Sequence, residues 1–188
     1  MPTDTRELYL TFDDGPVPEV TPWVLAQLRA HHAPATFFCI GDNVRKHPAV
    51  FAETLAQGHA IGNHTFHHVK GWTTGTHRYL EEVKACDDVL EQNGACTARL
   101  FRPPYGRITR AQISQLRNRP IVMWDVLTHD YNAALNPENI LRGSLQAVRS
   151  GSIVVFHDSL KAKKNLYYVL PRFLEQCRAN GFIFKSLV

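Results

Sequence analysis

Short apolar runs recur along the chain, and the segments between them are long enough to hold a helix. Seven runs have the length of buried strands: residues 7–12, 35–40, 59–63, 99–102, 121–126, 152–157 and 182–187. Between them the apolar positions follow a helical period, most clearly in 165–180. This alternation predicts an α/β fold with a mainly parallel sheet, either a closed or nearly closed barrel or a doubly wound sheet.

Composition and charge narrow the class of protein. The chain has 188 residues with 44% hydrophobic and 20% charged side chains, which suits one globular domain over residues 1–188. The net charge is +4, but the basic residues are scattered apart from a short stretch at 161–164, so we predict no nucleic-acid-binding module. No run reaches the ~18 apolar residues of a membrane span. The oligomeric state stays open.

The N-terminus and the cysteines bear on the cellular compartment. Residues 1–12 lack the apolar region of a signal peptide, so we expect a cytoplasmic protein, or an extracytoplasmic one whose leader was removed. The four cysteines show no CxxC spacing, and we predict buried free thiols at Cys39, Cys86, Cys96 and Cys177.

Polar residues interrupt the pattern where the predicted strands end. Asp13 and Asp14 follow the first strand, and His64 follows the third. Arg102 ends the fourth strand and His157 ends the sixth. Parallel α/β folds carry their chemistry at the carboxyl ends of the strands, so these residues are predicted to share one site.

The doubled aspartate and the segment "GNHTFHH" (62–68) together suggest a metal centre. His64 and His68 are four residues apart, a spacing that puts both imidazoles on one face if a helical turn begins there. Two imidazoles and one carboxylate leave coordination positions open for water, as catalysis requires. One aspartate would bind the metal, while the other would accept a proton from water that the metal activates. An iron-dependent oxygenase could use the same three ligands and is kept as an alternative.

Three further segments carry residues suited to hydrolysis. In "RPPYG" (102–106), Arg102 could hold the unligated carboxylate, and the backbone N–H of Tyr105 could donate to a developing oxyanion. In "WDVLTHDY" (124–131), Asp130 could orient and charge a histidine elsewhere. In "IVVFHD" (153–158), His157 ends an apolar strand and would serve as a general acid opposite the metal.

Five segments in fixed order resemble the polysaccharide deacetylase family, the NodB-like carbohydrate esterase family 4 that includes chitin and peptidoglycan deacetylases. They are "TFDDGP", "HTFHH", "RPPYG", "WDVLTHDY" and "IVVFHD", and the resemblance extends over about residues 7–188. It implies a distorted (β/α) barrel, often with seven strands and outer helices. It also implies metal-dependent removal of N-acetyl groups from N-acetylglucosamine units of an oligo- or polysaccharide, with release of acetate.

The resemblance also implies a role for each matching residue in catalysis. Asp13 resembles the catalytic base, and Arg102 resembles the arginine that positions it. Tyr105 resembles the residue whose backbone N–H helps to bind the oxyanion. Asp130 resembles the acid that tunes His157, which would be the general acid.

The metal set and the substrate pocket follow from the same resemblance. Asp14, His64 and His68 would hold one divalent ion, zinc by preference, although cobalt, nickel or manganese would suit the same ligands. Val155 stands where a leucine usually lines the acetyl-methyl pocket, and Tyr131 stands where a tryptophan is common, so pocket shape is expected to differ. Trp72, in a glycine-rich loop, is a candidate platform for a sugar ring or else a buried loop anchor.

The predicted function is therefore an N-deacetylase of a chitin-like or peptidoglycan-like glycan. Two alternatives within the same fold are an O-acetyl esterase acting on a xylan-type polysaccharide and a non-catalytic glycan-binding relative. Retention of both aspartates and of the strand-end histidine argues against the non-catalytic relative.

Overall fold

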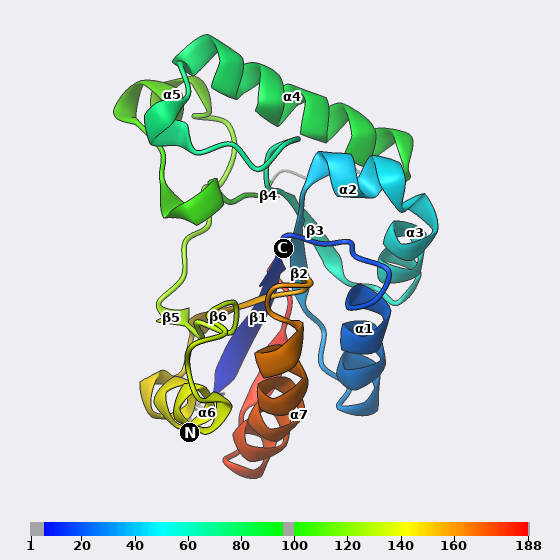
Figure 1. The fold of residues 1–188 in the computed structure, drawn as a ribbon, viewed down its shortest axis with the longest axis vertical. Helices are drawn as coiled ribbons and strands as arrows, with labels where there is room; N and C mark the ends of the chain where they lie inside the picture. The colour runs from blue at the N-terminus through cyan, green and yellow to red at the C-terminus, as the bar shows by residue number, and fades with distance from the viewer. Residues whose placement is uncertain (1–5, 96–99, 188) are drawn as a thin grey trace, which may run out of the picture.

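The structure is a computed structural model that describes residues 6–95 and 100–187 (Figure 1). Strands and helices alternate along the chain as the apolar pattern predicts. In order, they are β1 Glu7–Asp13, α1 Thr21–Ala30, β2 Thr36–Cys39, α2 Gly41–Lys46, α3 Pro48–Ala56, β3 Ala60–Asn63, the 3₁₀ helix η1 Gly71–Thr73, α4 Thr76–Gln92, β4 Leu100–Phe101, the 3₁₀ helix η2 Pro104–Gly106, α5 Arg110–Gln115, β5 Val126–Leu127, α6 Pro137–Ala147, β6 Ser152–His157, α7 Lys163–Ala179 and β7 Ile183–Lys185.

The strands form a seven-stranded sheet around a central β1. Six of them are ordered β4-β3-β2-β1-β6-β5, and β7 pairs with the first half of β1. Along one edge of β1, residues Glu7–Tyr9 pair with β7 and residues Thr11–Asp13 pair with β2, while β6 follows the other edge. Every ladder among the described strands is parallel, which confirms the predicted sheet and brings the carboxyl ends of the strands together.

The predicted strand at 121–126 is wrong in its extent, and the difference explains how the barrel is distorted. Ile121 forms only an isolated bridge with Phe101, and β5 consists of Val126–Leu127. The backbone N–H of Val122 donates to the carbonyl of Phe101 at 2.8 Å, whereas that of Asp125 donates to Ile153 at 3.2 Å. This segment therefore leaves the β4 edge and crosses to β6. It links the two ends of the sheet instead of adding a full strand.

Of the other six predicted strands, 152–157 agrees with β6 at both ends and 7–12 is one residue shorter than β1, whereas the remaining four are one to three residues longer than the strands observed. The run at 182–187 contains only Ile183–Lys185, and the run at 59–63 contains Ala60–Asn63. The run at 99–102 contains Leu100–Phe101, and its first residue lies outside the described part of the chain. The predicted helix at 165–180 agrees with α7 to within two residues at its start.

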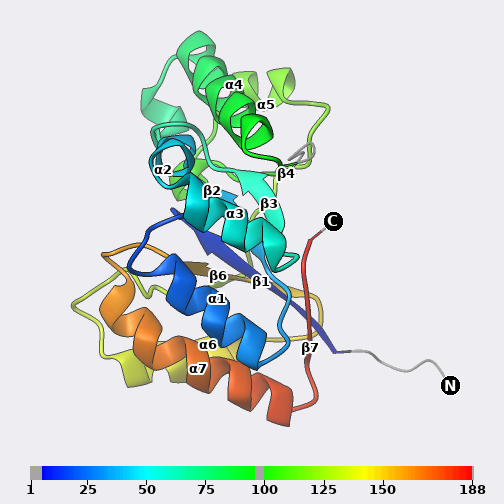
Figure 2. The ribbon, with the colours of Figure 1, turned by 90° about the vertical axis from the view of Figure 1, so that its right-hand side faces the viewer.

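Helices cover the outside of the sheet, and aromatic side chains fill the space between them. Figure 2 shows α1, α6 and α7 gathered on one side of β1, with α4 and α5 at the opposite end of the molecule. Phe12 of β1 stacks on Phe37 of β2 at 5.0 Å and on Phe156 of β6 at 5.7 Å, and Phe156 meets Phe173 of α7 edge to face. Burying each such ring contributes about 1.5–3 kcal/mol, so this row anchors the strands whose ends carry the site.

Successive side chains of β1 point to opposite faces of the sheet. Leu8, Leu10 and Phe12 are fully buried in the hydrophobic core. Thr11 and Asp13 are also buried, but they contact the guanidinium of Arg102. The alternation in β1 thus separates an apolar face that holds the fold together from a polar face that ends in the site.

Candidate active site

A pocket of about 640 Å³ opens at the carboxyl ends of the strands, where the sequence places its polar residues. It lies beside the ends of β1, β3 and β6 and beneath the loops that follow them. The residues that line it are Asp13, Asp14, Val17, Ile40, Asn43, His64, His68, Lys70, Tyr105, Arg107, Trp124, Leu127, Tyr131, Val155, His157, Ser159 and Lys161.

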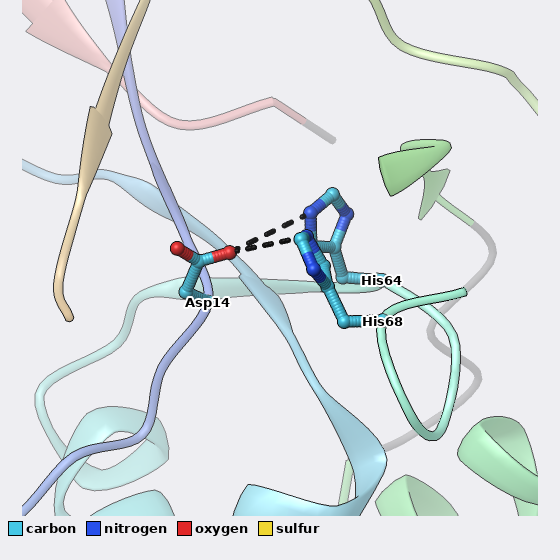
Figure 3. A group of neighbouring side chains, drawn as sticks. All are labelled: Asp14, His64 and His68. Atoms are coloured by element: carbon cyan, nitrogen blue, oxygen red, sulfur yellow. Dashed lines mark ion pairs between the residues drawn. The ribbon is translucent and has the colours of Figure 1, made fainter. Parts of the chain in front are cut away.

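Asp14, His64 and His68 converge on one point of this pocket (Figure 3). An oxygen of Asp14 lies 3.4 Å from Nε2 of His68 and 3.9 Å from Nε2 of His64, and the three ligand atoms are all within 4.8 Å of one another. When several donor atoms each bind one metal ion at about 2 Å, the distances between the donors are similar to these. The three residues can therefore hold one metal ion.

The two histidines are brought together by a loop, and the helical turn considered from their spacing is absent. Thr65 and His68 both have left-handed backbones, with φ of 62° and 56°. Such a conformation is unfavourable for a β-branched residue, and hydrogen bonds offset the cost at Thr65. Its N–H donates to Oδ1 of Asn63 at 2.8 Å, and its hydroxyl accepts from the N–H of Val69 at 3.1 Å.

Both imidazoles are prepared to bind a metal through Nε2. Nδ1 of His64 lies 2.7 Å from the carbonyl oxygen of Arg102. A carbonyl oxygen can only accept, so Nδ1 carries the proton and neutral His64 keeps a lone pair on Nε2. Burial, followed by the effect of neighbouring His64, lowers the pKa of His68 to about 4, which leaves that ring neutral at pH 7 as ligation requires.

The adjacent carboxylate, Asp13, has a different environment. Arg102 is fully buried and donates from Nη1 to Asp13 at 2.7 Å and to the hydroxyl of Thr11 at 2.7 Å. Burial by itself raises the pKa of Asp13, but the charge of Arg102, with smaller contributions from His64 and His157, outweighs it and lowers that pKa. Asp13 is therefore ionised at neutral pH and keeps one oxygen, Oδ2, that Arg102 does not bind.

Half-buried His157 and fully buried Asp130 form a second pair at the pocket. Oδ1 of Asp130 lies 2.7 Å from Nδ1 of His157, and Oδ2 accepts from the backbone N–H of His157 at 2.8 Å. Burial lowers the pKa of His157, but the hydrogen bond and charge of Asp130 raise it more, to about 9. His157 thus holds its proton at neutral pH, and the bond at Nδ1 leaves Nε2 available to the pocket.

Two tyrosines stand beside these histidines. The ring of Tyr105 lies 4.6 Å from the ring of His68, and the ring of Tyr131 meets that of His157 edge to face at 4.9 Å. Tyr105 has a left-handed backbone with φ of 60° within η2. Val155 is buried, and its sheet partner Leu127 also lines the pocket, so these two residues supply an apolar wall.

Trp72 and the third histidine of the 62–68 segment, His67, lie outside this pocket. Trp72 is 61% exposed, so the interpretation as a buried loop anchor is wrong; its ring is covered by the guanidinium of Arg107 at 4.4 Å. His67 lies outside the metal group because its backbone N–H and its Nδ1 both contact the buried carboxylate of Glu82, at 2.9 and 3.1 Å.

Asp158 supports the turn behind Asp14, a role that the sequence did not predict. It is fully buried and accepts from the N–H of Gly15 at 2.9 Å and from the hydroxyl of Thr21 at 2.6 Å. A Cβ atom on Gly15 would lie 1.9 Å from this carboxylate, so only glycine fits there. Asp14 has a φ of 86°, so the bend that separates the two aspartates begins at Asp14 itself. A polar residue directly after an apolar strand was the signal that could have identified Asp158.

The cysteines that the structure describes do not line the pocket. Cys39, Cys86 and Cys177 are buried free thiols, as predicted, whereas Cys96 lies outside the described residues. Burial raises the pKa of Cys177 to about 12, which keeps it a thiol.

Among the described residues, no helix is both long enough and apolar enough to cross a membrane.

The fold and the site together indicate the class of protein. A distorted parallel barrel presents a possible metal triad, a neighbouring ionised carboxylate and a protonated histidine in one pocket, a set suited to metal-assisted hydrolysis. The family model described as polysaccharide deacetylase matches residues 1–124. The chain belongs to the polysaccharide deacetylase family, which confirms the predicted family, its barrel fold and the hydrolase class.

Individual relatives extend the similarity over the whole chain. A peptidoglycan-N-acetylglucosamine deacetylase of Bacillus cereus is 32% identical over 99% of this chain and 68% of its own length. A chitooligosaccharide deacetylase of Azorhizobium caulinodans is 39% identical over 80% of this chain and 73% of its own. A crystal structure of a peptidoglycan N-acetylglucosamine deacetylase superimposes with a TM-score of 0.93 at 30% identity, covering 99% of this chain and 88% of that one.

Proposed function

We propose that this protein hydrolyses the acetamido group of N-acetylglucosamine units in an oligo- or polysaccharide. Water adds to the amide carbonyl, the C–N bond breaks, and the products are acetate and a glucosamine unit with a free amine. The observation that carries this proposal is the pair of adjacent aspartates. Asp14 faces both histidines of the metal group, whereas Asp13 lies 3.8 Å from His64 alone and is bound by Arg102. A family relationship to named deacetylases supports the same reaction.

Asp14, His64 and His68 would hold one divalent cation, with zinc the preferred ion for two imidazoles and one carboxylate. When bound, the cation polarises the amide carbonyl and lowers the pKa of water toward neutrality. Cobalt, nickel and manganese suit the same donors and are tested beside zinc.

Asp13 is assigned as the base. Its lowered pKa keeps it ionised near pH 7, and Arg102 fixes one oxygen so that the other can accept a proton from the attacking water. Charge develops on the amide oxygen as water adds, and the backbone N–H of Tyr105 is assigned as a donor to that oxygen.

His157 is assigned as the acid that protonates the leaving nitrogen. Its raised pKa means that the proton is present at neutral pH, and the Asp130 carboxylate orients the ring through Nδ1. The acetyl methyl group would contact Val155, and Tyr131 would contact the sugar beside it, since both line the pocket.

Acetate release tests this assignment. The protein is incubated with chitooligosaccharides and, separately, with O-acetylated xylan, before and after removal of metal by a chelator and again after addition of Zn²⁺, Co²⁺, Ni²⁺ or Mn²⁺. We expect acetate from the amide substrate, its loss on chelation and its return with metal. Release from xylan alone would favour the esterase alternative, and glycan binding without release from either substrate would favour the non-catalytic one.

A further inference from the structure

Helix α4 is hydrogen-bonded to the loop that carries the two metal-group histidines. The backbone N–H of Phe66, which lies between those histidines in the sequence, donates to the carbonyl oxygen of Glu82 at 3.0 Å. Nδ2 of Asn63, at the end of β3, donates to the carbonyl oxygen of Val83 at 2.8 Å. Both acceptors lie in the middle of α4. The loop therefore takes its position from a helix whose side chains the assigned reaction does not use.

Two acidic side chains of α4 add a second set of contacts to the loop. Oδ1 of Asp87 accepts from Nδ2 of Asn63 at 2.7 Å, and Asn63 directly precedes the first metal-group histidine. Oε2 of Glu82 accepts from the backbone N–H of His67 at 2.9 Å, and His67 directly precedes the second. Each acid thus holds the residue next to one of the two imidazoles that would bind the metal.

An arginine binds each of these acids. Nη2 of Arg119 donates to both oxygens of Asp87, at 2.9 and 3.0 Å. Nη2 of Arg78 lies 2.9 Å from Oε1 of Glu82, which is buried. Hydrogen bonds between ionised groups are shorter and stronger than those between neutral groups. The two carboxylates are therefore fixed in place, and each can fix its neighbour in the loop.

Asn63 passes the hold of Asp87 on to the backbone of the loop. Both hydrogens of its amide are used by α4, one by Val83 and one by Asp87, so the orientation of the amide is set. Its Oδ1 then accepts from the N–H of Thr65 at 2.8 Å. Thr65 has a left-handed backbone, which is costly for a β-branched residue. Asp87 thus helps to maintain the strained conformation between the two histidines.

We infer that Glu82 and Asp87 are positioning residues of the metal group, each acting on one histidine through the loop. This rests on the proposed function, because the metal group is the one assigned there. Neither acid lines the pocket or belongs to the metal group. Their loss should leave all three ligands present but less well placed, which lowers metal affinity. Glu82 binds the backbone N–H of His67, so His67→Ala keeps this contact.

Each acid has a control directly beside it in the sequence. Asp88 follows Asp87, and Glu81 precedes Glu82. Asp88 and Glu81 each contact a side chain four positions earlier on α4, at 2.6 and 3.6 Å, so these contacts stay within the helix. Asp88→Ala and Glu81→Ala therefore remove the same kinds of side chain from α4 without touching the contacts to the loop.

Titration of Zn²⁺ into the metal-free protein, in competition with a chromophoric chelator, measures the effect. Asp87→Ala and Glu82→Ala should each bind Zn²⁺ about tenfold more weakly, at the lower end of the range for groups that orient metal ligands. The two controls should match the wild type. Asp87→Asn and Glu82→Gln keep an oxygen that can accept from the same N–H group. They should bind about threefold more weakly, and they decide the test where an alanine variant does not fold.

Thermal unfolding of the metal-free variants separates positioning from stability. A lower unfolding temperature with wild-type Zn²⁺ affinity in the Asp87 and Glu82 variants would overturn this inference. Equal losses of affinity in these variants and in their controls would overturn it as well. Acetate release from the wild type tests the proposed function separately. Tight Zn²⁺ binding without acetate release would contradict the deacetylase assignment, while weaker binding in only the Asp87 and Glu82 variants would still support the positioning role.

Discussion

Two groups of residues at the pocket differ in burial and in the contacts that hold them. We call the reaction-centre residues the floor, namely Asp13, Asp14, Arg102, Asp130 and His157, and we call Tyr105 and its outer neighbour Trp72, with the cations over their rings, the rim. On the floor, Arg102 and Asp130 are fully buried, and each is bound to a charged partner at 2.7 Å. On the rim, Tyr105 and Trp72 are 57% and 61% exposed, and their partners are cations over ring faces. Breaking a buried charge pair costs several kcal/mol, whereas exposed contacts contribute about 1 kcal/mol or less. The floor should therefore govern the reaction and the rim should govern the choice of substrate.

The two adjacent aspartates of the floor also differ in environment. Asp13 is buried and bound to an arginine, whereas Asp14 is partly exposed and faces two imidazoles. Both carboxylates lie within 3.9 Å of Nε2 of His64, but Arg102 binds Asp13 and His68 lies beside Asp14. Two identical side chains next to each other in sequence can thus take different roles because the fold gives them different partners.

The largest effect is expected from the metal group. Asp14→Ala and His68→Ala should each lose stoichiometric metal and lower kcat by about 10³–10⁴-fold, since the cation supplies several kcal/mol of charge stabilisation. His67→Ala is the matched control, because that ring is bound to Glu82, and it should retain metal. Elemental analysis of the purified variants measures this. Metal loss from His67→Ala comparable with that from His68→Ala would contradict the assigned ligand set.

Asp13→Asn should separate the two aspartates. The amide cannot accept a proton from water, so kcat should fall by about 10²–10⁴-fold, the range for a positioned base. Metal content should match that of the wild type, because Asp13 is not in the metal group. Elemental analysis and acetate release are measured on one preparation. Equal metal loss in Asp13→Asn and Asp14→Ala would overturn the division of roles.

The pH dependence of kcat/KM tests the assignment of His157 as the acid. His157 must be protonated to act, so kcat/KM should fall as pH rises through its pKa, which is about 9 and is moved lower by a bound cation. Asp130→Asn removes the charge that raises this pKa, so the alkaline limb should move to lower pH. His157→Ala should remove the limb and cost about 10²–10⁴-fold in rate. A wild-type rate and limb in His157→Ala would show that the proton comes from another group.

A smaller effect is expected beneath the floor, at Asp158. Asp158→Asn keeps the shape but gives the hydroxyl of Thr21 a donor in place of its acceptor, which should loosen the Gly15 turn behind Asp14. Metal affinity should fall by about tenfold, as for other groups that orient ligands.

Asp125→Asn is the control for Asp158→Asn. Asp125 likewise accepts from a hydroxyl and a backbone N–H, those of Ser152 and Ile153, but it neither belongs to the metal group nor lines the pocket. Metal titration and thermal unfolding are measured for both variants. A loss of stability without a change in metal affinity in Asp158→Asn would reduce that residue to a purely structural role.

The smallest effect is expected on the rim. Trp72→Ala removes the ring beneath Arg107 and should raise KM for the glycan substrate about two- to fivefold, the equivalent of about 0.5–1 kcal/mol. Steady-state kinetics should give an unchanged kcat, because Trp72 does not line the pocket. A fall in kcat without a change in KM would mean that the rim also shapes the reaction centre.

Local patterns in the sequence were sufficient to predict the strands and helices and to locate the motifs along the chain. Apolar runs separated by helical periods predicted a parallel sheet, and polar residues at the ends of those runs predicted where the site would lie. These inferences succeed because periodicity and strand ends are properties of neighbouring residues. The doubled aspartate could be interpreted in the same way, since its strand, its turn and its charge are adjacent in the chain.

Only the tertiary structure decided which of those residues meet and how. Asp158 contacts Gly15 across 143 positions, and Arg102 reaches Asp13 across 89. A loop with left-handed residues joins His64 to His68 without a helix, and the crossing of 121–126 between two edges of the sheet shortened a predicted strand. Such contacts depend on packing between distant segments, and the strength of each charge pair depends on its burial. Neither the contacts between distant segments nor the burial of a charge pair can be inferred from the neighbours of a residue in the sequence.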